Sequence, residues 1–327
     1  MAALLSGAAD DLEAGGPTAD LLGPLEQDPP GTVPALRFAG ALHRLVLERR
    51  APLLATHYPS VGGTAPVERV WPDARDAVVE HLDLLRELVR RPVQTNEVGR
   101  SAVLLGGLAL LSGDGLPVRL LEVGASAGLN LLADRFALRV DGVVRGSADS
   151  PVLLEEPWQG DLPPEVPVDV VERRGCDPQP LDPRTTQGRL TLTSYVWADQ
   201  RARLERLRGA LALAEQTAFE VDPLPGSAFL ARELAAPRPG VCTVVWHSVV
   251  WQYLSVQERT AVDDVVASAG TRATAEAPLA RLTLEPERVG DAEFRFRVTA
   301  QTWPGGDSRV LADAEGHGPP VVWRPRG

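Results

Sequence analysis

The sequence predicts an α/β protein with a doubly wound, mostly parallel sheet, an antiparallel C-terminal end to that sheet, and a helical N-terminal region before it. Three observations carry this prediction. Apolar residues have helical spacing up to residue 115, short β-type runs alternate with helical stretches over residues 117–268, and strand patterns without helices follow residue 280. We therefore divide the chain into a helical N-terminal cap, residues 1–115, and a sheet domain, residues 116–327.

Helices are expected throughout the first third of the chain. Breaks that contain proline, at residues 24–34 and 58–66, separate them, and an apolar helix is expected over Ser101–Leu111. The residues whose spacing indicates two of the helical faces are Leu42, Leu45, Val46, Val78, Leu82, Leu85 and Leu88.

The sheet is expected to start at Pro117–Val123, a β-type run followed by a glycine turn, Gly124–Gly128, and by helical spacing over Leu129–Phe136. Residues 141–166 are rich in proline and are expected to be irregular. Further strands are expected at residues 168–172, 217–221, 241–246, 280–284, 293–299 and 308–311, and helices at 194–215, 228–235 and 256–268.

Composition argues against several classes of function. The chain has 327 residues, 44% of them apolar, which is enough for a sizeable core, and its formal net charge of -11 repels nucleic acids and anionic membranes. The N-terminus has no basic flank, and no apolar run approaches the roughly 18 residues that span a bilayer. We therefore expect a cytoplasmic protein with small-molecule or protein partners. Cys176 and Cys242 lack metal-ligand spacing, so neither a metal site nor a disulfide framework is expected.

The sequence contains no lysine and no isoleucine, which indicates a GC-rich coding sequence. Residue types with AT-rich codons should then persist mainly where their chemistry is needed. Only two asparagines remain, Asn96 and Asn130. Both are candidates for function, and the alternative is that they are buried packing or capping residues.

Acidic residues stand at the ends of the first three expected strands of the sheet. In a doubly wound sheet the ligand crevice lies at the carboxyl ends of the strands, where a glycine turn lets the backbone approach the ligand closely. Glu122 and Asp177 are placed to accept hydrogen bonds from ribose hydroxyls or an amino group. Asp222 is placed to meet the exocyclic amine of an adenine ring. The pattern therefore predicts a nucleotide-like cofactor at Gly124–Gly128.

The same residues, together with Cys242–Leu254 before a helix, carry a resemblance. Over residues 116–312 the chain resembles the class I S-adenosylmethionine-dependent methyltransferases. The resemblance implies a Rossmann-like sheet and S-adenosylmethionine as the cofactor. The chain departs from that family at Ser126, where glycine is usual. The implied cofactor-binding residues are Glu122, Gly124, Ser126, Gly128, Asn130, Asp177 and Asp222.

As a whole, the chain also resembles an uncharacterised bacterial family described only as a domain of unknown function, through Gln94–Arg100 and Leu121–Asn130. This second resemblance implies no activity. The first of the two segments concentrates amide, hydroxyl, carboxylate and guanidinium groups just before a helix, so Asn96, Glu97 and Arg100 are candidates for substrate contacts. The alternative is a capped helix start with an internal ion pair.

His247 follows the fourth expected strand of the sheet, at the edge of the expected crevice. A neutral imidazole there can accept a proton near pH 7, which makes His247 a candidate catalytic residue beside Asn96, Glu97 and Arg100. The alternative is a hydrogen-bonded histidine packed among neighbouring aromatic residues. Ordinary surface or loop positions are expected for the histidines His43, His81 and His317.

The glycine turn also fits Gly-x-Ser-x-Gly, which exposes the nucleophile in serine hydrolases. A hydrolase nucleophile normally follows several strands, whereas Ser126 follows the first, and this interpretation leaves Glu122 without a role. Ser126 can also simply cap the next helix. The chain order of this alternative site is Ser126, Asp222 and then His247 or His317, with Gly62-Gly63 as an oxyanion loop.

We expect S-adenosylmethionine-dependent methyl transfer to a small-molecule acceptor. The Asn-Pro-Pro-Tyr type of motif found in methyltransferases that act on amide or base nitrogens is absent, since His247-Ser-Val-Val occupies that position. Nucleic-acid bases are therefore not expected as substrates. Two alternatives stay open, a serine hydrolase and a catalytically inactive, methyltransferase-like binding protein.

Overall fold

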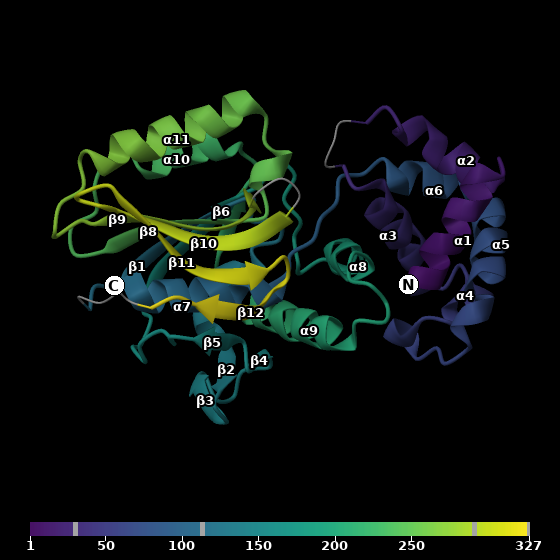
Figure 1. Ribbon diagram of the computed structural model, residues 1–327, viewed down its shortest axis with the longest axis horizontal. Coiled ribbons are helices and arrows are strands. Elements are labelled where there is room, and N and C mark those ends of the chain that lie inside the picture. Colours follow the sequence, from purple (N-terminus) through teal and green to yellow (C-terminus); the bar gives the residue numbers. More distant parts are fainter. Residues whose placement is uncertain (29–31, 112–114, 290–292, 326–327) are drawn as a thin grey trace. The chain divides into compact units, whose positions relative to one another are not determined.

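The computed structural model describes residues 1–28, 32–111, 115–289 and 293–325. It divides into two compact units (Figure 1). The helical unit comprises Met1–Thr95 and Pro183–Glu205, and the sheet unit comprises Asn96–Asp182 and Arg206–Gly327.

The helical unit is built from α-helices and short three-ten helices around its own core. The predicted faces are confirmed, because Leu42, Leu45, Val78 and Leu85 are fully buried in that core, while Leu82 and Leu88 pack against it. The elements are α1 (Ala2–Glu13), α2 (Pro17–Leu22), η1 (Gly23–Leu25), α3 (Pro34–Leu47), α4 (Pro52–Ala55), η2 (Pro59–Val61), η3 (Val67–Arg69), α5 (Val70–Glu80), α6 (Leu82–Val89) and α8 (Thr186–Ser194).

The sheet unit contains a nine-stranded sheet in the order β5-β12-β11-β10-β9-β8-β1-β6-β7. Strands β7, β6, β1, β8 and β9 pair in parallel, β9 to β12 pair antiparallel, and β12 pairs in parallel with β5. The predicted α/β class, mostly parallel sheet and antiparallel C-terminal end are therefore confirmed. The strands are β1 (Val118–Val123), β5 (Trp158–Gly160), β6 (Val170–Cys176), β7 (Glu220–Asp222), β8 (Cys242–Ser248), β9 (Leu279–Val289), β10 (Glu293–Trp303), β11 (Asp307–Glu315) and β12 (Gly318–Trp323).

Helices cover both faces of this sheet (Figure 1). Helices α10 (Gly226–Glu233) and α11 (Val256–Gly270) pack on the face that carries Leu121 and Val245, while α7 (Ser101–Leu111) packs on the face that carries Leu120. We call these the α11 face and the α7 face. The chain passes between the two units along α9 (Arg201–Gln216).

The compact units divide the chain differently from the predicted boundary at residue 115. Helix α7 is apolar on all sides and is buried from Ser101 to Ala109 among residues of the sheet. It therefore belongs to the sheet unit and not to the N-terminal cap. Residues 183–205, predicted as part of the sheet domain, belong to the helical unit.

The segment after the glycine turn also differs from the prediction. Leu129–Arg135 forms a three-ten helix, η5, where α-helical spacing was expected. The prediction of an irregular segment at residues 141–166 is wrong at three short strands, β3, β4 and β5, and holds for the rest of the segment. A second sheet with the order β3-β2-β4 is formed by β2 (Ala137–Val140), β3 (Val143–Gly146) and β4 (Leu153–Glu155), and β5 joins the large sheet.

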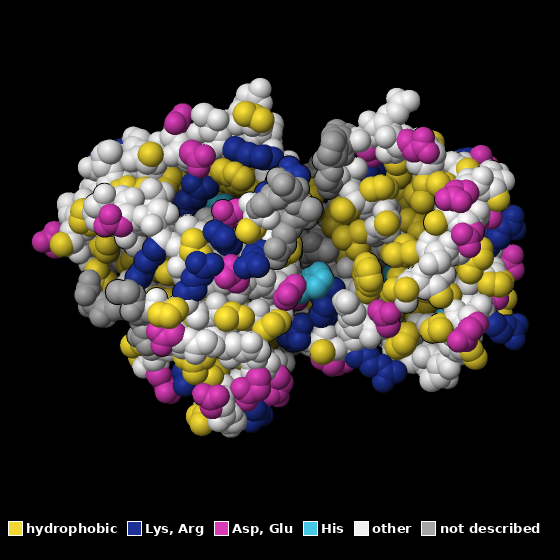
Figure 2. All heavy atoms as spheres, viewed as in Figure 1, with side chains coloured by type: hydrophobic (Ala, Val, Ile, Leu, Met, Phe, Trp, Pro, Cys, Tyr) yellow, Lys and Arg dark blue, Asp and Glu magenta, His cyan; other side chains and the backbone are white. Residues whose placement is uncertain are grey.

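Basic and acidic side chains are interspersed on the surface of the sheet unit (Figure 2). Ion pairs join neighbouring strands. Arg297 of β10, for example, lies 3.1 Å from Glu287 of β9 and 3.8 Å from Asp313 of β11. Because the sequence contains no lysine, every such cation other than the chain terminus and histidine is an arginine.

Candidate functional site

The winding of the sheet reverses at β1. The chain passes from β1 to β6 and β7 on one side and then crosses to β8 and β9 on the other side of β1. In open α/β sheets, such a reversal leaves a crevice at the carboxyl ends of the two central strands, and ligands bind there. The residues that follow β1, β6 and β8 therefore define the candidate site.

The turn after β1 requires glycine at two positions. Gly124 and Gly128 have φ values of 71° and 74°, in the left-handed region that favours glycine. A Cβ on Gly128 would lie 2.7 Å from the Phe219 ring, and one on Gly124 would collide with Val250. Ser126, between them, is also left-handed, with a φ of 53°. The sequence prediction of a tight backbone turn at this position is confirmed.

Asp177 holds this turn in place. Its Oδ2 accepts a hydrogen bond of 3.0 Å from the Ser126 N–H, and its Oδ1 accepts one of 2.9 Å from the Gln179 N–H. The Gly124 N–H donates to the Cys176 carbonyl at 2.9 Å. Asp177 therefore lies at the glycine turn, as predicted, and positions its backbone.

Glu122 lies beneath the turn, on the α7 face, with only 2% of its surface exposed. Among the described residues its Oε2 makes no hydrogen bond of normal geometry, and neither does Nε1 of Trp246, which stands opposite Glu122 in the β1–β8 register and lies close enough to lower the pKa of Glu122. Burial raises the pKa of Glu122 from 4.5 to about 8, against the opposing effects of the Asn130 amide and the Arg100 guanidinium. Ser101 Oγ donates to Asn130 Oδ1 at 2.8 Å. A protonated, incompletely paired carboxyl group thus lies at the point where the winding reverses.

Asn96 and Arg100, which precede α7, make hydrogen bonds near the glycine turn and Glu122. Asn96 Oδ1 accepts a hydrogen bond of 2.8 Å from the Leu129 N–H, at the start of η5. Arg100 donates from Nε to the Gly316 carbonyl at 2.9 Å and from a terminal nitrogen to the Ser248 carbonyl at 3.1 Å. The structure therefore brings Asn96 and Arg100 to the glycine turn and to the end of β8.

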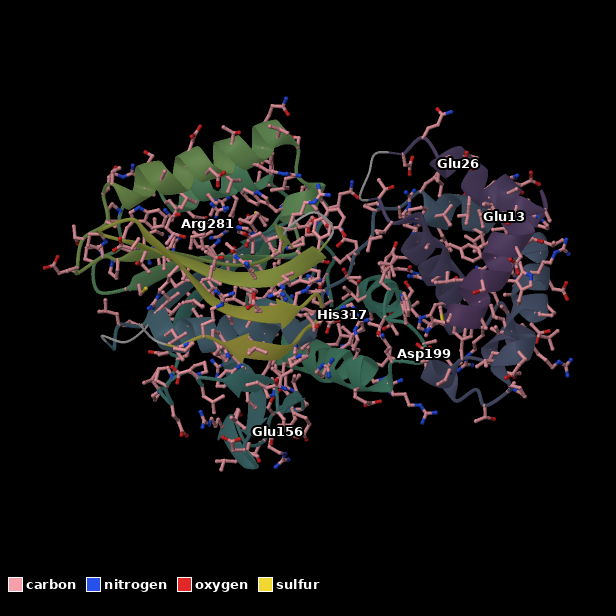
Figure 3. All side chains as sticks on the ribbon, viewed as in Figure 1. Glu13, Glu26, Glu156, Asp199, Arg281 and His317 are labelled. Atoms are coloured by element: carbon pink, nitrogen blue, oxygen red, sulfur yellow. The ribbon has the colours of Figure 1, made fainter. Side chains whose placement is uncertain are left out.

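Glu97 is paired with His317, which the sequence singles out only as a histidine of the alternative serine-hydrolase series. The Glu97 side chain is 3% exposed, and its Oε1 accepts a hydrogen bond of 3.0 Å from the Gly99 N–H. His317, in the turn between β11 and β12, is 57% exposed (Figure 3) and places Nδ1 3.6 Å from Glu97 Oε2. A Cβ on Gly99 would lie 2.5 Å from the His317 carbonyl oxygen, so the two segments approach closely. No local sequence signal could have paired residues so far apart.

His247 lies on the α11 face and so is separated from Glu122 by the sheet. Its Nδ1 lies 2.8 Å from Glu285 Oε1, and its Nε2 accepts a hydrogen bond of 3.2 Å from Arg281, which also pairs with Asp263 of α11. The ring stacks on Trp251 with centroids 4.8 Å apart. Burial lowers the pKa of His247, although Glu285 opposes this effect. These partners assign a neutral ring with its proton on Nδ1, and the structure does not bring His247 together with the other predicted catalytic residues.

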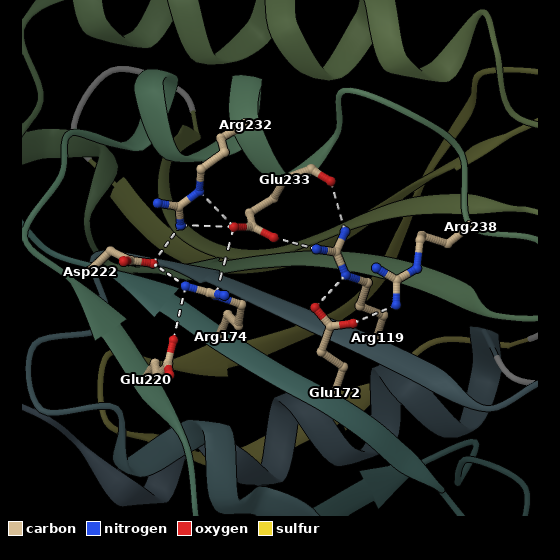
Figure 4. Close-up of polar contacts among 8 residues, drawn as sticks. All are labelled: Arg119, Glu172, Arg174, Glu220, Asp222, Arg232, Glu233 and Arg238. Atoms are coloured by element: carbon tan, nitrogen blue, oxygen red, sulfur yellow. Dashed lines mark hydrogen bonds and ion pairs between the residues drawn. The ribbon is translucent and has the colours of Figure 1, made fainter.

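Asp222 is held by two arginines (Figure 4). Its Oδ2 accepts hydrogen bonds of 2.6 Å from Arg232 and 3.1 Å from Arg174. Burial alone would raise the pKa of Asp222, but these two hydrogen bonds outweigh it and hold the pKa below its ordinary value. The network continues through Glu220, Glu233, Arg119, Glu172 and Arg238.

The geometry also bears on the alternative series in its form with His247, namely Ser126, Asp222 and His247. Ser126 is buried in the turn, Asp222 is paired with arginines, and both ring nitrogens of His247 are engaged by other side chains. This series is therefore not assembled. Cys176 and Cys242 are free and buried.

Within the described ranges, no group of three or more His, Cys, Asp or Glu side chains is arranged to hold a metal ion. No helix in the same ranges combines the length and apolarity needed to cross a membrane.

The architecture is that of an α/β protein built on one large, mostly parallel sheet. Residues 1–323 match a family described as "Uncharacterized protein conserved in bacteria (DUF2332)", and the chain belongs to that family. A comparison with curated proteins gave no match.

Proposed function

We propose that the carboxyl edge around β1 binds S-adenosylmethionine and that the protein transfers its methyl group to a small molecule. The observation that carries the proposal is Glu122, a buried carboxyl group with an unpaired oxygen at the point where the winding of the sheet reverses. A buried polar atom without a partner is rare in a folded protein, and a bound polar ligand is one way to satisfy it.

The residues around Glu122 have the chemistry that this cofactor needs. The glycine turn allows close approach of the backbone. Asp177 carries lone pairs beyond the two that the turn uses, and these can accept ribose hydroxyls. The amide of Asn130 and the carboxyl of Glu122 provide both donors and acceptors for the amino-acid end of the cofactor. Asp222 is a weaker candidate than its sequence position indicates, because its Oδ2 is already paired with two arginines.

The bound cofactor would supply a methyl group on a sulfonium centre, and the protein would supply orientation. Holding the acceptor in line with that methyl group accounts for much of the acceleration in such reactions. An acceptor that must lose a proton needs a base at the edge of the site. His317 is 57% exposed beside the buried Glu97 carboxyl and is our candidate for that role, whereas His247 is buried on the other face of the sheet.

Calorimetric titration with S-adenosylmethionine and S-adenosylhomocysteine tests the proposal. Asp177→Asn keeps the shape of the side chain but removes its charge, and Glu165→Gln, at a side chain that is 72% exposed, is the matched control in the same unit. We expect saturable binding to the wild type and the control, and weaker binding to Asp177→Asn. Binding must also raise the melting temperature, because a ligand at a concentration of 100 Kd increases the free energy of unfolding by about 2.7 kcal/mol.

Two outcomes would contradict the proposal. Absence of binding at millimolar cofactor would reject the cofactor site. Tight binding without transfer of a labelled methyl group to any small-molecule acceptor would reject the enzyme and favour a methyltransferase-like binding protein.

A further inference from the structure

The helical unit contains a serine and a histidine in direct hydrogen-bond contact. Ser60 Oγ, on η2, lies 2.8 Å from Nε2 of His43, on α3. Nδ1 of the same ring lies 3.2 Å from the backbone carbonyl of Ser194, at the end of α8. The three residues come from separate parts of the chain and meet within one compact unit.

The partners determine where the proton on the ring lies. A carbonyl oxygen only accepts hydrogen bonds, so Nδ1 must carry the proton and donate it to Ser194. Nε2 then bears a lone pair, and the hydroxyl of Ser60 donates to it. His43 is 1% exposed, and burial lowers its pKa to about 4 against the opposing effect of the Ser194 carbonyl, so the ring is neutral at pH 7.

Ser60 itself is only partly buried, so this residue, unlike His43, is in part exposed to solvent. The backbone around it is fixed, because Gly62 N–H donates to the Pro59 carbonyl at 3.2 Å and Gly63 N–H to the Tyr58 carbonyl at 3.0 Å. Gly62 and Gly63 were considered above as an oxyanion loop for Ser126, and they instead close the turn that carries Ser60.

Other polar atoms of the same segment are left unsatisfied. His57 Nδ1 and Tyr58 Oη are buried and have no hydrogen-bond partner among the described residues, and the Tyr58 ring lies 5.4 Å from the ring of His43. Unsatisfied buried polar groups are uncommon in a segment that serves packing alone.

We propose that Ser60 and His43 form a nucleophile and base pair that cleaves esters with good leaving groups. The arrangement has the three parts of an activated nucleophile: a hydroxyl, a base in contact with it, and a third group that orients the base.

The reaction balances without a cofactor. Nε2 of His43 takes the hydroxyl proton as Oγ of Ser60 bonds to the acyl carbon, and the bond from that carbon to the leaving oxygen breaks. The leaving oxygen takes the proton from Nε2. Water then attacks the acyl-serine with the same base, and the products are an acid and an alcohol.

The third group selects the class of substrate. The Ser194 carbonyl carries no full charge, so it stabilises an imidazolium less than a carboxylate would, and burial disfavours the imidazolium further. Attack is therefore expected on acyl groups whose leaving group needs little help from a proton. Aryl esters meet this condition, whereas amides do not.

Labelling with a fluorophosphonate tests the pair in the full-length protein. The wild type should take up one label per chain, at Ser60 by peptide mass mapping. Ser60→Ala should abolish labelling, while Ser308→Ala, at an exposed serine of β11 in the sheet unit, should leave it unchanged. Hydrolysis of p-nitrophenyl acetate should fall about 100-fold in His43→Gln and in Ser60→Ala.

Melting curves and titration with S-adenosylmethionine serve as controls for folding and for the sheet unit. Ser60→Ala removes one oxygen atom from a partly exposed side chain and should keep both properties, so this variant decides the question even if His43→Gln does not fold. No labelling of the folded wild type, or labelling that persists in Ser60→Ala, would overturn the proposal. A label on Ser126 would overturn it in favour of the other serine site.

Discussion

The free energy of unfolding of the wild type should fall as the pH rises, and replacing Glu122 by glutamine should abolish this decrease. The folded protein holds the Glu122 proton up to a pKa of about 8, whereas the unfolded chain releases it near 4.5. The unfolded state therefore binds fewer protons between these values, and the free energy of unfolding falls as the pH increases. Each pH unit costs about 1.4 kcal/mol, so the loss reaches up to about 5 kcal/mol at pH 8 and then levels off.

Glutamine copies the shape of the protonated side chain and does not titrate. Glu122→Gln and the wild type should therefore be equally stable at pH 5, and the variant should be more stable by several kcal/mol at pH 8.5. In a domain of 150–250 residues, about 1 kcal/mol shifts the melting temperature by about 2–4 °C, so the difference is large in a thermal melt.

The assay is a melting curve at each of pH 5, 7 and 8.5 for the wild type, Glu122→Gln and Glu165→Gln. The exposed Glu165 control should follow the wild type at every pH. Parallel curves for the wild type and Glu122→Gln over this range would refute the assignment of a protonated carboxyl group at Glu122. A more stable wild type at pH 8.5 would refute the sign of the linkage.

Three further changes have defined outcomes. The pKa of about 4 at His43 means that the folded protein resists a protonation that the unfolded chain undergoes below pH 6.5, so up to about 3 kcal/mol of stability should be lost on acidification to pH 4. In His43→Gln, thermal melts at pH 4.5 and 7 should lack that loss, and equal acid sensitivity in both proteins would contradict the reasoning. Gly128→Ala and Gly142→Ala both place alanine at positive φ, at a cost of about 1–2 kcal/mol, but only the Cβ at residue 128 meets another side chain. Urea denaturation should therefore give a lower free energy of unfolding for Gly128→Ala than for Gly142→Ala. Equal values for the two variants would show that the turn can accommodate a Cβ at residue 128. Arg119→Leu breaks a buried ion pair with Glu233, but Glu233 keeps Arg232 and Arg174 as partners, so the cost in the same assay should stay below the cost of about 3–5 kcal/mol for a buried charge left unpaired. A cost below that of a surface substitution would contradict a structural role for the pair.

Elements with a regular pattern were predictable from the sequence. Helix Ser101–Leu111 has the bounds that apolar spacing predicted, and the strand–turn pattern at Gly124 is present. The hairpin of β2 and β3 was not predicted, because the prolines in residues 141–166 indicate irregular structure. The dipeptide Asp141-Gly142, which favours a two-residue hairpin turn, was the signal that could have identified it. Strand β12 was missed because it contains Pro319 and Pro320, which disfavour a strand.

The candidate site was predictable only where its residues are close in sequence or share one edge of the sheet. Asn96 and Asp177 reach the glycine turn, and Arg100 reaches the end of β8, as the density of polar groups and the strand order indicated. The position of His247 on the other face of the sheet depends on the register between strands, and that register comes from packing over the whole sheet. The contact between Glu97 and His317 joins segments that no pattern in the sequence relates.

The large sheet ends on both sides in strands of only three residues, β5 and β7. Exposed backbone at a sheet edge can recruit a strand from another molecule, and a longer edge offers more hydrogen bonds for such pairing. Here a second chain would gain a ladder of three residues at most, and Pro223 and Pro225, directly after β7, lack the donors needed to extend it. The short edges therefore protect a broad sheet from growing into an aggregate by strand addition.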